Sequence, residues 1–278
     1  MEEFVRDARG KGLAPERALR EMFQRTILYS LSISGFWLRY VFQGGTSLRL
    51  FYDSPRYSLD LDFTYIGDQV GLIPKEIGTV RNTVERIFSP YDVSVDITRE
   101  KLMGRERFYR CFLVFDTSRL IGRKLRIKVE VLVRSYNQGM FLKKMLLINF
   151  PLRTSVGVLV KTPSQLLVDK VASLAGGYRR GFIRWRDIFD IYWLRTRFNA
   201  LIEPDYLALE YGSYIEKPGD LDKLQNLLEK ILSNKSYDDI ILELAKILPL
   251  SLASEEFVKQ YIETSLLVVK EAKEVLNA

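Results

Sequence analysis

The chain has 278 residues, 47% of them hydrophobic and 28% charged, a balance typical of folded globular proteins and not of disordered ones. It contains no histidine and a single cysteine, Cys111, which excludes serine–histidine and cysteine–histidine catalysis, histidine-ligated zinc and an internal disulfide. The net charge of +7 favours an anionic partner such as phosphate or nucleic acid, although a soluble basic protein without such a partner would carry the same charge.

The N-terminal part gives no sign of a secretion signal or a membrane span. Its most apolar stretch, 26–42, is interrupted by serines, Gly35 and Arg39 and is too polar to cross a bilayer. We therefore expect a cytoplasmic protein that does not associate with membranes. Cys111 lies in an apolar stretch without an activating neighbour, so we expect it to be a small buried hydrophobic residue.

Up to residue 160, helical and alternating apolar patterns predict a sheet with flanking helices. Apolar residues at helical spacing predict a helix over 16–34, with Pro15 in its first turn. An apolar run predicts a buried strand over 36–42, followed by a tight turn at 43–47 and a short helix over 47–52. Alternation predicts strands over 57–65, 91–98, 108–115 and 124–134, and shorter ones over 145–150 and 156–160.

After Lys161 the pattern becomes helical. Thr162 and Pro163 form an N-cap and a first-turn proline, and Gly176-Gly177 is expected to close that helix. Further amphipathic helices are expected over 185–198, 223–233, 237–248 and 255–276. The order predicts an α+β protein: a mixed sheet flanked by helices in residues 1–160, and a helical C-terminal domain in residues 161–278.

Asp60 and Asp62 are the first candidates for chemistry. In a strand they point to the same side, while Leu59, Leu61 and Phe63 would point into the core. Neighbouring carboxylates repel each other unless a cation lies between them, and oxygen ligands suit Mg²⁺ or Mn²⁺. The alternative is a polar strand face at a sheet edge, which an Asp-x-Asp pattern alone favours.

The Gln-Gly-Gly-Thr-Ser segment lies just upstream of these aspartates. Gly44 and Gly45, between a strand and a helix, would let the backbone approach a ligand. The helix start, with Thr46 and Ser47, would offer amides and hydroxyls to a phosphate. A plain tight turn is the alternative, but the glycine pair followed by an Asp-x-Asp strand is more specific than either motif alone.

Glu130 provides a third carboxylate on the polar face of the strand predicted over 124–134. A neighbouring strand could bring it to the same metal site, where it would help to hold a second metal ion and activate an attacking hydroxyl. The alternative is an ion pair with Lys128 or Arg126 on a solvated face.

Lys170 interrupts the apolar stripe of the helix that begins at Pro163, so its ammonium would reach either solvent or an anion in a cleft. Asp187 and Asp190 share a helical face, where they could orient Lys170 or nearby arginines, take part in chemistry, or form structural salt bridges. The best local candidates for binding NTP phosphates or an RNA backbone are Arg179, Arg180, Arg184 and Arg186.

These motifs occur in an order that resembles a known family. The segments 44–50 (Gly-Gly-Thr-Ser-Leu-Arg-Leu) and 56–63 (Arg-x-Ser-x-Asp-Leu-Asp-Phe) resemble the opening motif of the AbiEii toxins, nucleotidyltransferases of the DNA-polymerase-beta-like superfamily. The resemblance continues through 127–131 and Lys170 and ends at 186–194. It implies a nucleotidyltransferase core whose active-site cleft is completed by a helical C-terminal domain, NTP as substrate, tRNA as the acceptor, and an antitoxin partner in phage defence.

The resemblance also assigns roles to residues of this chain. It implies that Asp60, Asp62 and Glu130 hold Mg²⁺ or Mn²⁺, and that catalysis depends on these three together with Lys170 and Asp190. The nucleotide would be contacted by Gly44, Gly45, Thr46, Ser47, Arg56, Ser58, Lys170 and Asp187. The family often carries aspartate where this chain has Glu130, which is one methylene longer and still able to bind a metal.

Other functions stay open at this point. The same fold could belong to a catalytically silent protein that binds nucleotide or RNA, or to an enzyme that transfers the nucleotide to a protein. A metal-dependent nuclease also uses clustered carboxylates and a lysine. The Gly-Gly segment and the place of Lys170 on a helix far beyond Glu130 disfavour a nuclease.

Overall fold

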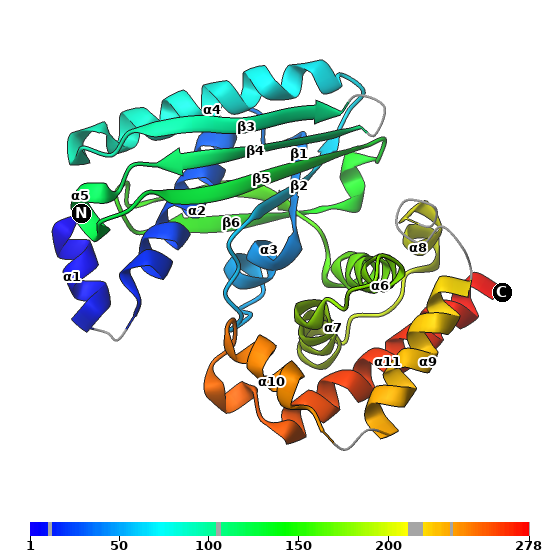
Figure 1. Ribbon diagram of the computed structural model, residues 1–278. Coiled ribbons are helices and arrows are strands. Elements are labelled where there is room, and N and C mark those ends of the chain that lie inside the picture. The colour runs from blue at the N-terminus through cyan, green and yellow to red at the C-terminus, as the bar shows by residue number, and fades with distance from the viewer. Residues whose placement is uncertain (11–12, 104–106, 211–218, 234–235, 278) are drawn as a thin grey trace. The chain divides into compact units, whose positions relative to one another are not determined.

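The computed structural model describes residues 1–10, 13–103, 107–210, 219–233 and 236–277. They form two compact units (Figure 1). The first unit comprises Met1–Tyr52 and Leu59–Lys161, and the second comprises Asp53–Ser58 and Thr162–Ala278. The short segment Asp53–Ser58 thus belongs to the helical unit although both of its flanking segments belong to the sheet unit.

In the described residues, the first unit is built on a seven-stranded mixed sheet. Its strands are β1 (Tyr40–Gln43), β2 (Leu61–Ile66), β3 (Val95–Met103), β4 (Phe108–Phe115), β5 (Leu125–Arg134), β6 (Leu142–Ile148) and β7 (Thr154–Val160). They lie in the order β3-β4-β5-β2-β1-β7-β6, with β2–β5 and β1–β7 parallel and the other pairs antiparallel. Strand β2 is central, so residues of β1, β2 and β5 are neighbours.

Helices of the first unit cover the sheet and supply part of its core. They are α1 (Glu2–Gly10), α2 (Pro15–Ile33), α3 (Gly44–Phe51), α4 (Ile73–Phe88) and α5 (Ser118–Ile121). Helices α2 and α4 pack against each other and against the sheet, and the rings of Phe23 and Phe115 stack at 4.0 Å between centroids. Every second residue of β5 is fully buried against them, as its alternation predicts.

The second unit is helical in its described part. It consists of α6 (Pro163–Arg179), α7 (Trp185–Phe198), α8 (Pro204–Glu210), α9 (Gly219–Ser233), α10 (Asp238–Ala245) and α11 (Glu255–Asn277). Thr162 and Gln165 form a capping box at the start of α6, because each side chain accepts a hydrogen bond from the other residue's backbone N–H. Helix α11 packs against both α7 and α9.

Several sequence predictions are confirmed. The α+β class, with a mixed sheet followed by helices, is the observed architecture. Strand 108–115 and helix 185–198 have the predicted bounds. The helix predicted over 16–34 is shifted by one residue at both ends, and the one predicted over 255–276 extends one residue further, to Asn277. Cys111 is fully buried, and burial raises the pKa of its thiol to about 11, which keeps the thiol protonated and unreactive.

Other sequence predictions were wrong. The turn predicted at 43–47 is the first turn of α3, which begins at Gly44, and Gly176-Gly177 lies inside α6 and does not close it. Leu59 was expected in the core but is 54% exposed, because β2 begins only at Leu61. The helices α1, α4, α5 and α8 were missed; α4 does carry a helical apolar pattern, in its buried Ile73, Ile77, Val80 and Val84.

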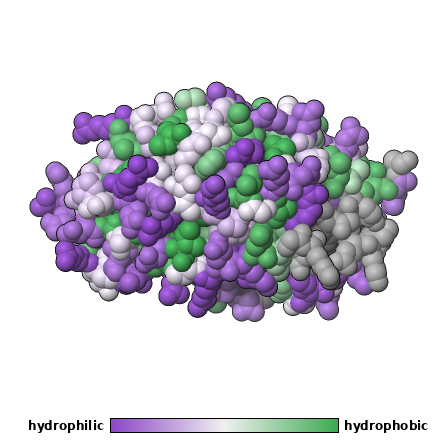
Figure 2. Space-filling model, turned by 90° about the horizontal axis from the view of Figure 1, so that it is seen from above, coloured by the Kyte–Doolittle hydropathy of each residue, from purple (hydrophilic) through white to green (hydrophobic). Residues whose placement is uncertain are grey.

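One face of the molecule carries small hydrophobic patches scattered among hydrophilic residues (Figure 2). Single exposed apolar side chains of this kind are normal for folded proteins. No helix in the described part of the chain has both the length and the apolar character that crossing a bilayer requires.

Candidate functional site

The junction between β1 and α3 holds the carboxylate of Asp62 against the backbone. Gln43, the last residue of β1, is paired with Asp62 of β2, and Gly44 follows with φ +77°. A Cβ atom at Gly44 would lie 2.2 Å from Asp62 Oδ2 and 2.9 Å from its Cγ. Both the backbone angle and the close approach therefore require glycine at this position. Gly44 serves here to admit a side chain of the site itself.

The hydroxyls of Thr46 and Ser47 are turned inward. Thr46 Oγ1 donates to the carbonyl oxygen of Asp60, and Ser47 Oγ donates to that of Gly44 at 2.9 Å; both side chains are fully buried. They fix the loop before β2 and the first turn of α3. The side chain of Gln43 does not cap α3 and instead accepts a hydrogen bond from Thr64 Oγ1 at 2.8 Å. Backbone amides of this first turn, together with Gly45, are thus the groups suited to a phosphate.

The parallel pairing of β2 and β5 places Asp62 directly beside Glu130. Asp60 lies just before β2, and Lys128 Nζ is 3.0 Å from Asp60 Oδ2 and 3.0 Å from Glu130 Oε2. Arg110 Nη1 is 3.8 Å from the other oxygen of Glu130. The structure thus joins Asp60 to Glu130 through an ammonium, and the Lys128–Glu130 ion pair considered as the alternative is present.

The chemistry of this carboxylate group suits a hard cation. Burial alone lowers the pKa of Lys128, but Asp60 and Glu130 raise it above its usual value, so the ammonium is held charged. The negative charge that attracts Lys128 would equally attract a divalent cation, and carboxylate oxygens are the ligands that Mg²⁺ and Mn²⁺ prefer. Among the described residues, no three carboxylate or cysteine side chains are placed so that together they could hold a metal ion.

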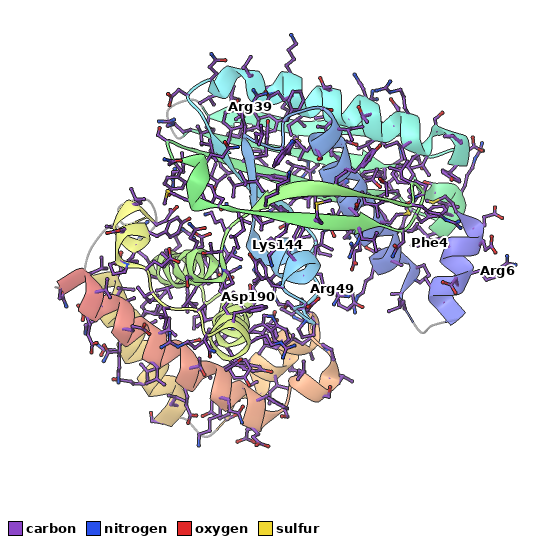
Figure 3. The ribbon with its side chains drawn as sticks, turned by 180° about the vertical axis from the view of Figure 1, so that it is seen from behind. Phe4, Arg6, Arg39, Arg49, Lys144 and Asp190 are labelled. Atoms are coloured by element: carbon purple, nitrogen blue, oxygen red, sulfur yellow. The ribbon has the colours of Figure 1, made fainter. Side chains whose placement is uncertain are left out.

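A second group of charges is buried inside the helical unit (Asp190 is labelled in Figure 3). Arg56 binds Asp190 through two parallel contacts, Nε to Oδ1 at 2.7 Å and Nη2 to Oδ2 at 2.8 Å. Lys170 Nζ lies 2.8 Å from Asp190 Oδ2 and 3.2 Å from Asp187 Oδ1, and Arg184 Nε lies 2.7 Å from Asp187 Oδ2. We call these five residues the buried charge cluster.

Mutual pairing keeps Asp190 and Lys170 of the buried charge cluster ionised. Burial raises the pKa of Asp190, but Arg56 and Lys170 outweigh it and hold the pKa at about 2. Burial lowers the pKa of Lys170, while Asp187 and Asp190 raise it above its usual value. Both aspartates are fully buried, so neither charge would be tolerated without these partners.

Arg56 and Ser58 were expected to contact the nucleotide. Both belong to the second unit, where Arg56 pairs with Asp190. The remaining guanidinium nitrogen of Arg56, Nη1, donates to the carbonyl oxygen of Tyr57 at 3.2 Å, so all three nitrogens are engaged within the second unit. Ser58 is half-buried in the same segment. Nucleotide contact by these two residues stays a prediction. Arg56 and Asp190 are 134 positions apart, and the sequence alone offers no sign of their pairing.

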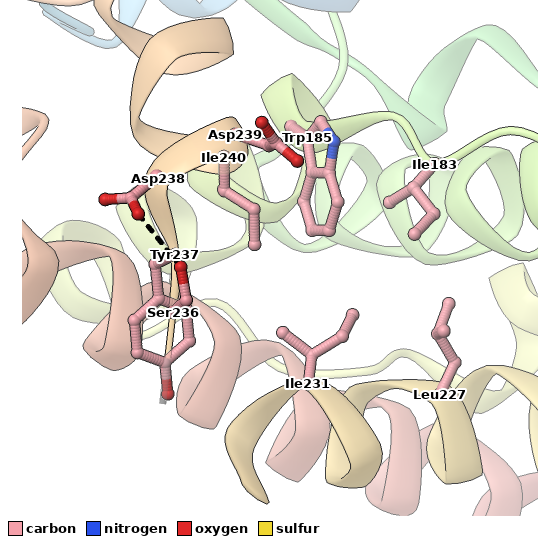
Figure 4. A pocket seen from close by; sticks show the side chains of 9 residues that line it. All are labelled: Ile183, Trp185, Leu227, Ile231, Ser236, Tyr237, Asp238, Asp239 and Ile240. Carbon is pink, nitrogen blue, oxygen red and sulfur yellow. Dashed lines mark hydrogen bonds between the residues drawn. The ribbon is translucent and has the colours of Figure 1, made fainter. Parts of the chain in front are cut away.

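The second unit also contains a pocket of about 380 Å³ (Figure 4). It is lined by Ile183, Trp185, Leu227, Ile231, Ser236, Tyr237, Asp238, Asp239 and Ile240. Polar and apolar surfaces contribute equally to its wall, and Asp238 accepts a hydrogen bond from Ser236 Oγ at 3.0 Å. None of the residues predicted for the site lines this pocket.

A family model described as "Nucleotidyl transferase AbiEii toxin, Type IV TA system" matches residues 26–260. The chain belongs to this family. It is a nucleotidyltransferase of the toxin type, as the motifs predict, and a family of toxin–antitoxin systems implies an antitoxin partner. A search of curated protein sequences found no match.

Solved structures show the same fold. The nucleotidyltransferase toxin MenT4 from Mycobacterium tuberculosis H37Rv is similar with a TM-score of 0.60 at 17% identity, covering 98% of this chain and 90% of that one. JHP933 from Helicobacter pylori gives a TM-score of 0.57 at 17% identity, over 95% and 97% of the two chains. A putative nucleotidyltransferase from H. pylori gives 0.57 at 17% identity, over 94% and 98%.

Proposed function

We propose that this AbiEii-family protein transfers a nucleotide from an NTP to RNA, with tRNA as the acceptor, using a divalent cation held by Asp60, Asp62 and Glu130. The observation that carries the proposal is the juxtaposition of these carboxylates with the start of α3. Asp62 lies beside Glu130 and against Gly44, and Asp60 is joined to Glu130 through a bound ammonium. Carboxylates beside a helix start are what recognition of a metal-bound phosphate requires.

Each group of this site has a chemical task in the proposed reaction. Backbone amides at the start of α3 bind phosphate oxygens of the NTP. The metal, when bound, neutralises phosphate charge and favours departure of pyrophosphate. The acceptor hydroxyl oxygen forms a bond to the α-phosphorus, the bond from that phosphorus to the bridging oxygen breaks, and pyrophosphate leaves. Glu130 is the candidate to accept the hydroxyl proton.

The buried charge cluster is proposed to hold Lys170 in place for contact with the nucleotide. Asp187 and Asp190 contact its ammonium from two positions on α7, and Arg56 and Arg184 hold the two aspartates. In this proposal Asp190 and Asp187 are positioning residues, because they act through the lysine. Three positive and two negative side chains leave the cluster with an excess of positive charge that suits a phosphate.

The reaction is tested by incubating the purified protein with each of the four labelled NTPs, Mg²⁺ or Mn²⁺, and total tRNA. We expect label to appear on tRNA with one NTP. The Asp62→Asn variant should lose about a thousandfold or more in rate, because several kcal/mol of charge stabilisation are removed. Asp68→Asn is the matched control, since Asp68 follows the same strand but is 86% exposed.

Other outcomes would assign a different function. Label on protein in place of RNA would identify a protein-nucleotidylating enzyme, and shortened RNA without label would identify a nuclease. Nucleotide binding without turnover would identify a silent binding protein. Full activity of Asp62→Asn would contradict the assignment of the carboxylate site.

A further inference from the structure

The loop after α6 begins with a Schellman motif, a common C-terminal ending of helices. The N–H of Phe182 donates to the carbonyl oxygen of Gly177 at 3.2 Å, and the N–H of Gly181 donates to that of Tyr178 at 2.9 Å. Gly181 has φ +85°, the left-handed conformation that this ending requires. In such an ending the residue at the place of Phe182 usually packs against a side chain one turn earlier in the helix.

That packing is missing in this protein, because the positions one turn earlier are Gly176 and Gly177. Neither offers a side chain, and Phe182 is left 47% exposed. The hydrogen bonds of the helix ending fix the backbone of Phe182, and its ring remains half-exposed. Glycine inside a helix is destabilising relative to alanine, so helix stability does not account for the pair.

Local packing explains why residue 177 is a glycine. A Cβ atom at Gly177 would lie 3.2 Å from Arg184 Cγ and 3.3 Å from the carbonyl oxygen of Phe182. The glycine thus lets the returning loop pass close to α6. This explains the path of the loop but does not explain why an aromatic residue occupies its exposed position.

The exposed ring is surrounded by positive charge. The stretch 179–186 contains four arginines and no acidic residue. The guanidinium carbon of Arg180 lies 5.4 Å from the centroid of the Phe182 ring. Arg180 and Arg186 are exposed, whereas Arg184 is turned toward Asp187 in the buried charge cluster.

We propose that the loop 179–186 binds an unpaired nucleotide of the RNA acceptor, with its base stacked on Phe182 and its backbone phosphates beside Arg180 and Arg186. Unpaired bases stack on exposed aromatic rings and on arginine guanidinium planes, and exposed arginines bind the adjoining phosphates. A base inside a duplex is not free to stack in this way. The inference rests on the proposed transfer to RNA and adds the feature of RNA that is recognised.

The test is fluorescence anisotropy with a short labelled single-stranded RNA and with its duplex. Phe182→Leu keeps an apolar side chain but removes the aromatic face, and Phe182→Trp keeps both. We expect Phe182→Leu to weaken binding of the single strand about tenfold, because stacking of one base contributes about 1–3 kcal/mol, and Phe182→Trp to bind like the unmodified protein. Binding of the duplex should be the same in all three proteins.

Two further variants separate stacking from general effects. Leu201→Ala removes another exposed side chain of the same unit, which is 56% exposed, and should leave RNA binding unchanged. Arg180→Gln should lower the slope of log K against log salt by about 0.7, the value expected for one phosphate contact on a single strand.

The outcomes also separate this inference from the proposed reaction. Unchanged single-strand binding by Phe182→Leu, or equal losses in Phe182→Leu and Phe182→Trp, would overturn the inference and assign the ring to a protein partner, even if label transfer to tRNA is observed. Binding that depends on Phe182 in a protein that labels no RNA would support the inference and contradict the reaction.

Discussion

The two groups of charged residues differ in how firmly their charges are held. In the sheet unit, Asp60 and Glu130 share Lys128, and all three side chains are 26% exposed. In the helical unit, Asp187 and Asp190 are fully buried between Arg56, Lys170 and Arg184. Water can screen and replace the first set of contacts but not the second. The difference indicates a cation that can be exchanged in one unit and a fixed framework in the other.

The largest effect on stability is expected from Asp190→Asn. The substitution keeps the shape of the side chain but leaves Arg56 and Lys170 with an uncompensated buried charge, which costs about 3–5 kcal/mol. Urea unfolding measures the loss, with Asp205→Asn on the exposed surface of α8 as the matched control. Equal stability of the two variants would show that the cluster is not a fixed framework.

Acid should weaken the same framework. The pKa of Asp190 is lowered to about 2 in the folded protein from an ordinary value of 3.8, so its contribution is present above about pH 4 and is lost as the pH falls toward 2. The difference corresponds to about 2 kcal/mol. Unfolding measured across this range should show a steeper loss for the unmodified protein than for Asp190→Asn. Parallel curves would contradict the assignment.

Gly44 and Gly122 of the sheet unit have nearly the same backbone angle, so alanine substitutions at the two positions can be compared directly. Gly44 has φ +77° and Gly122 has φ +76°, but only a Cβ at Gly44 would meet another residue, Asp62. Both alanine variants should lose about 1–2 kcal/mol to the left-handed backbone. Gly44→Ala should in addition displace Asp62 and abolish label transfer, which Gly122→Ala should leave intact. If Gly44→Ala stays active, the contact with Asp62 is not needed for transfer.

The smallest effect on stability is expected from Lys128→Met. Its ion pairs are partly exposed, so the metal-free protein should lose less than about 1 kcal/mol. Removal of the competing ammonium should tighten Mn²⁺ binding up to about tenfold, measured by electron paramagnetic resonance of the free ion. Lys101→Met, on the exposed face of β3, is the control. Weaker Mn²⁺ binding by Lys128→Met would show that the lysine supports the metal and does not compete with it.

The sequence predicted the strand positions of Asp62 and Glu130, but not which strands would be neighbours in the sheet. Alternation places Asp62 and Glu130 on polar strand faces, and the structure adds that β2 and β5, which are separated by β3 and β4 in the sequence, are parallel neighbours. Register between distant strands depends on tertiary packing, which a local pattern does not encode.

The conformations predicted for the two Gly-Gly pairs were both wrong, and for a related reason. Gly44-Gly45 was predicted to form a turn, and Gly176-Gly177 to end a helix. Gly44 instead begins α3 with a left-handed backbone angle, and Gly176-Gly177 lies inside α6. Glycine permits several backbone conformations, so its neighbours in space decide which one is adopted. At Gly44 the neighbour is Asp62, and at Gly177 it is Arg184. Neither neighbour is adjacent in sequence.

The assignment of Asp53–Ser58 to the helical unit has a consequence for synthesis on the ribosome. Arg56 leaves the ribosome 134 residues before Asp190, its partner in the buried charge cluster. The second part of the sheet unit, Leu59–Lys161, is translated during that interval. A nascent chain can therefore complete its carboxylate site before Asp190, the partner of Arg56, has been synthesised, and truncation after residue 161 would remove that partner altogether.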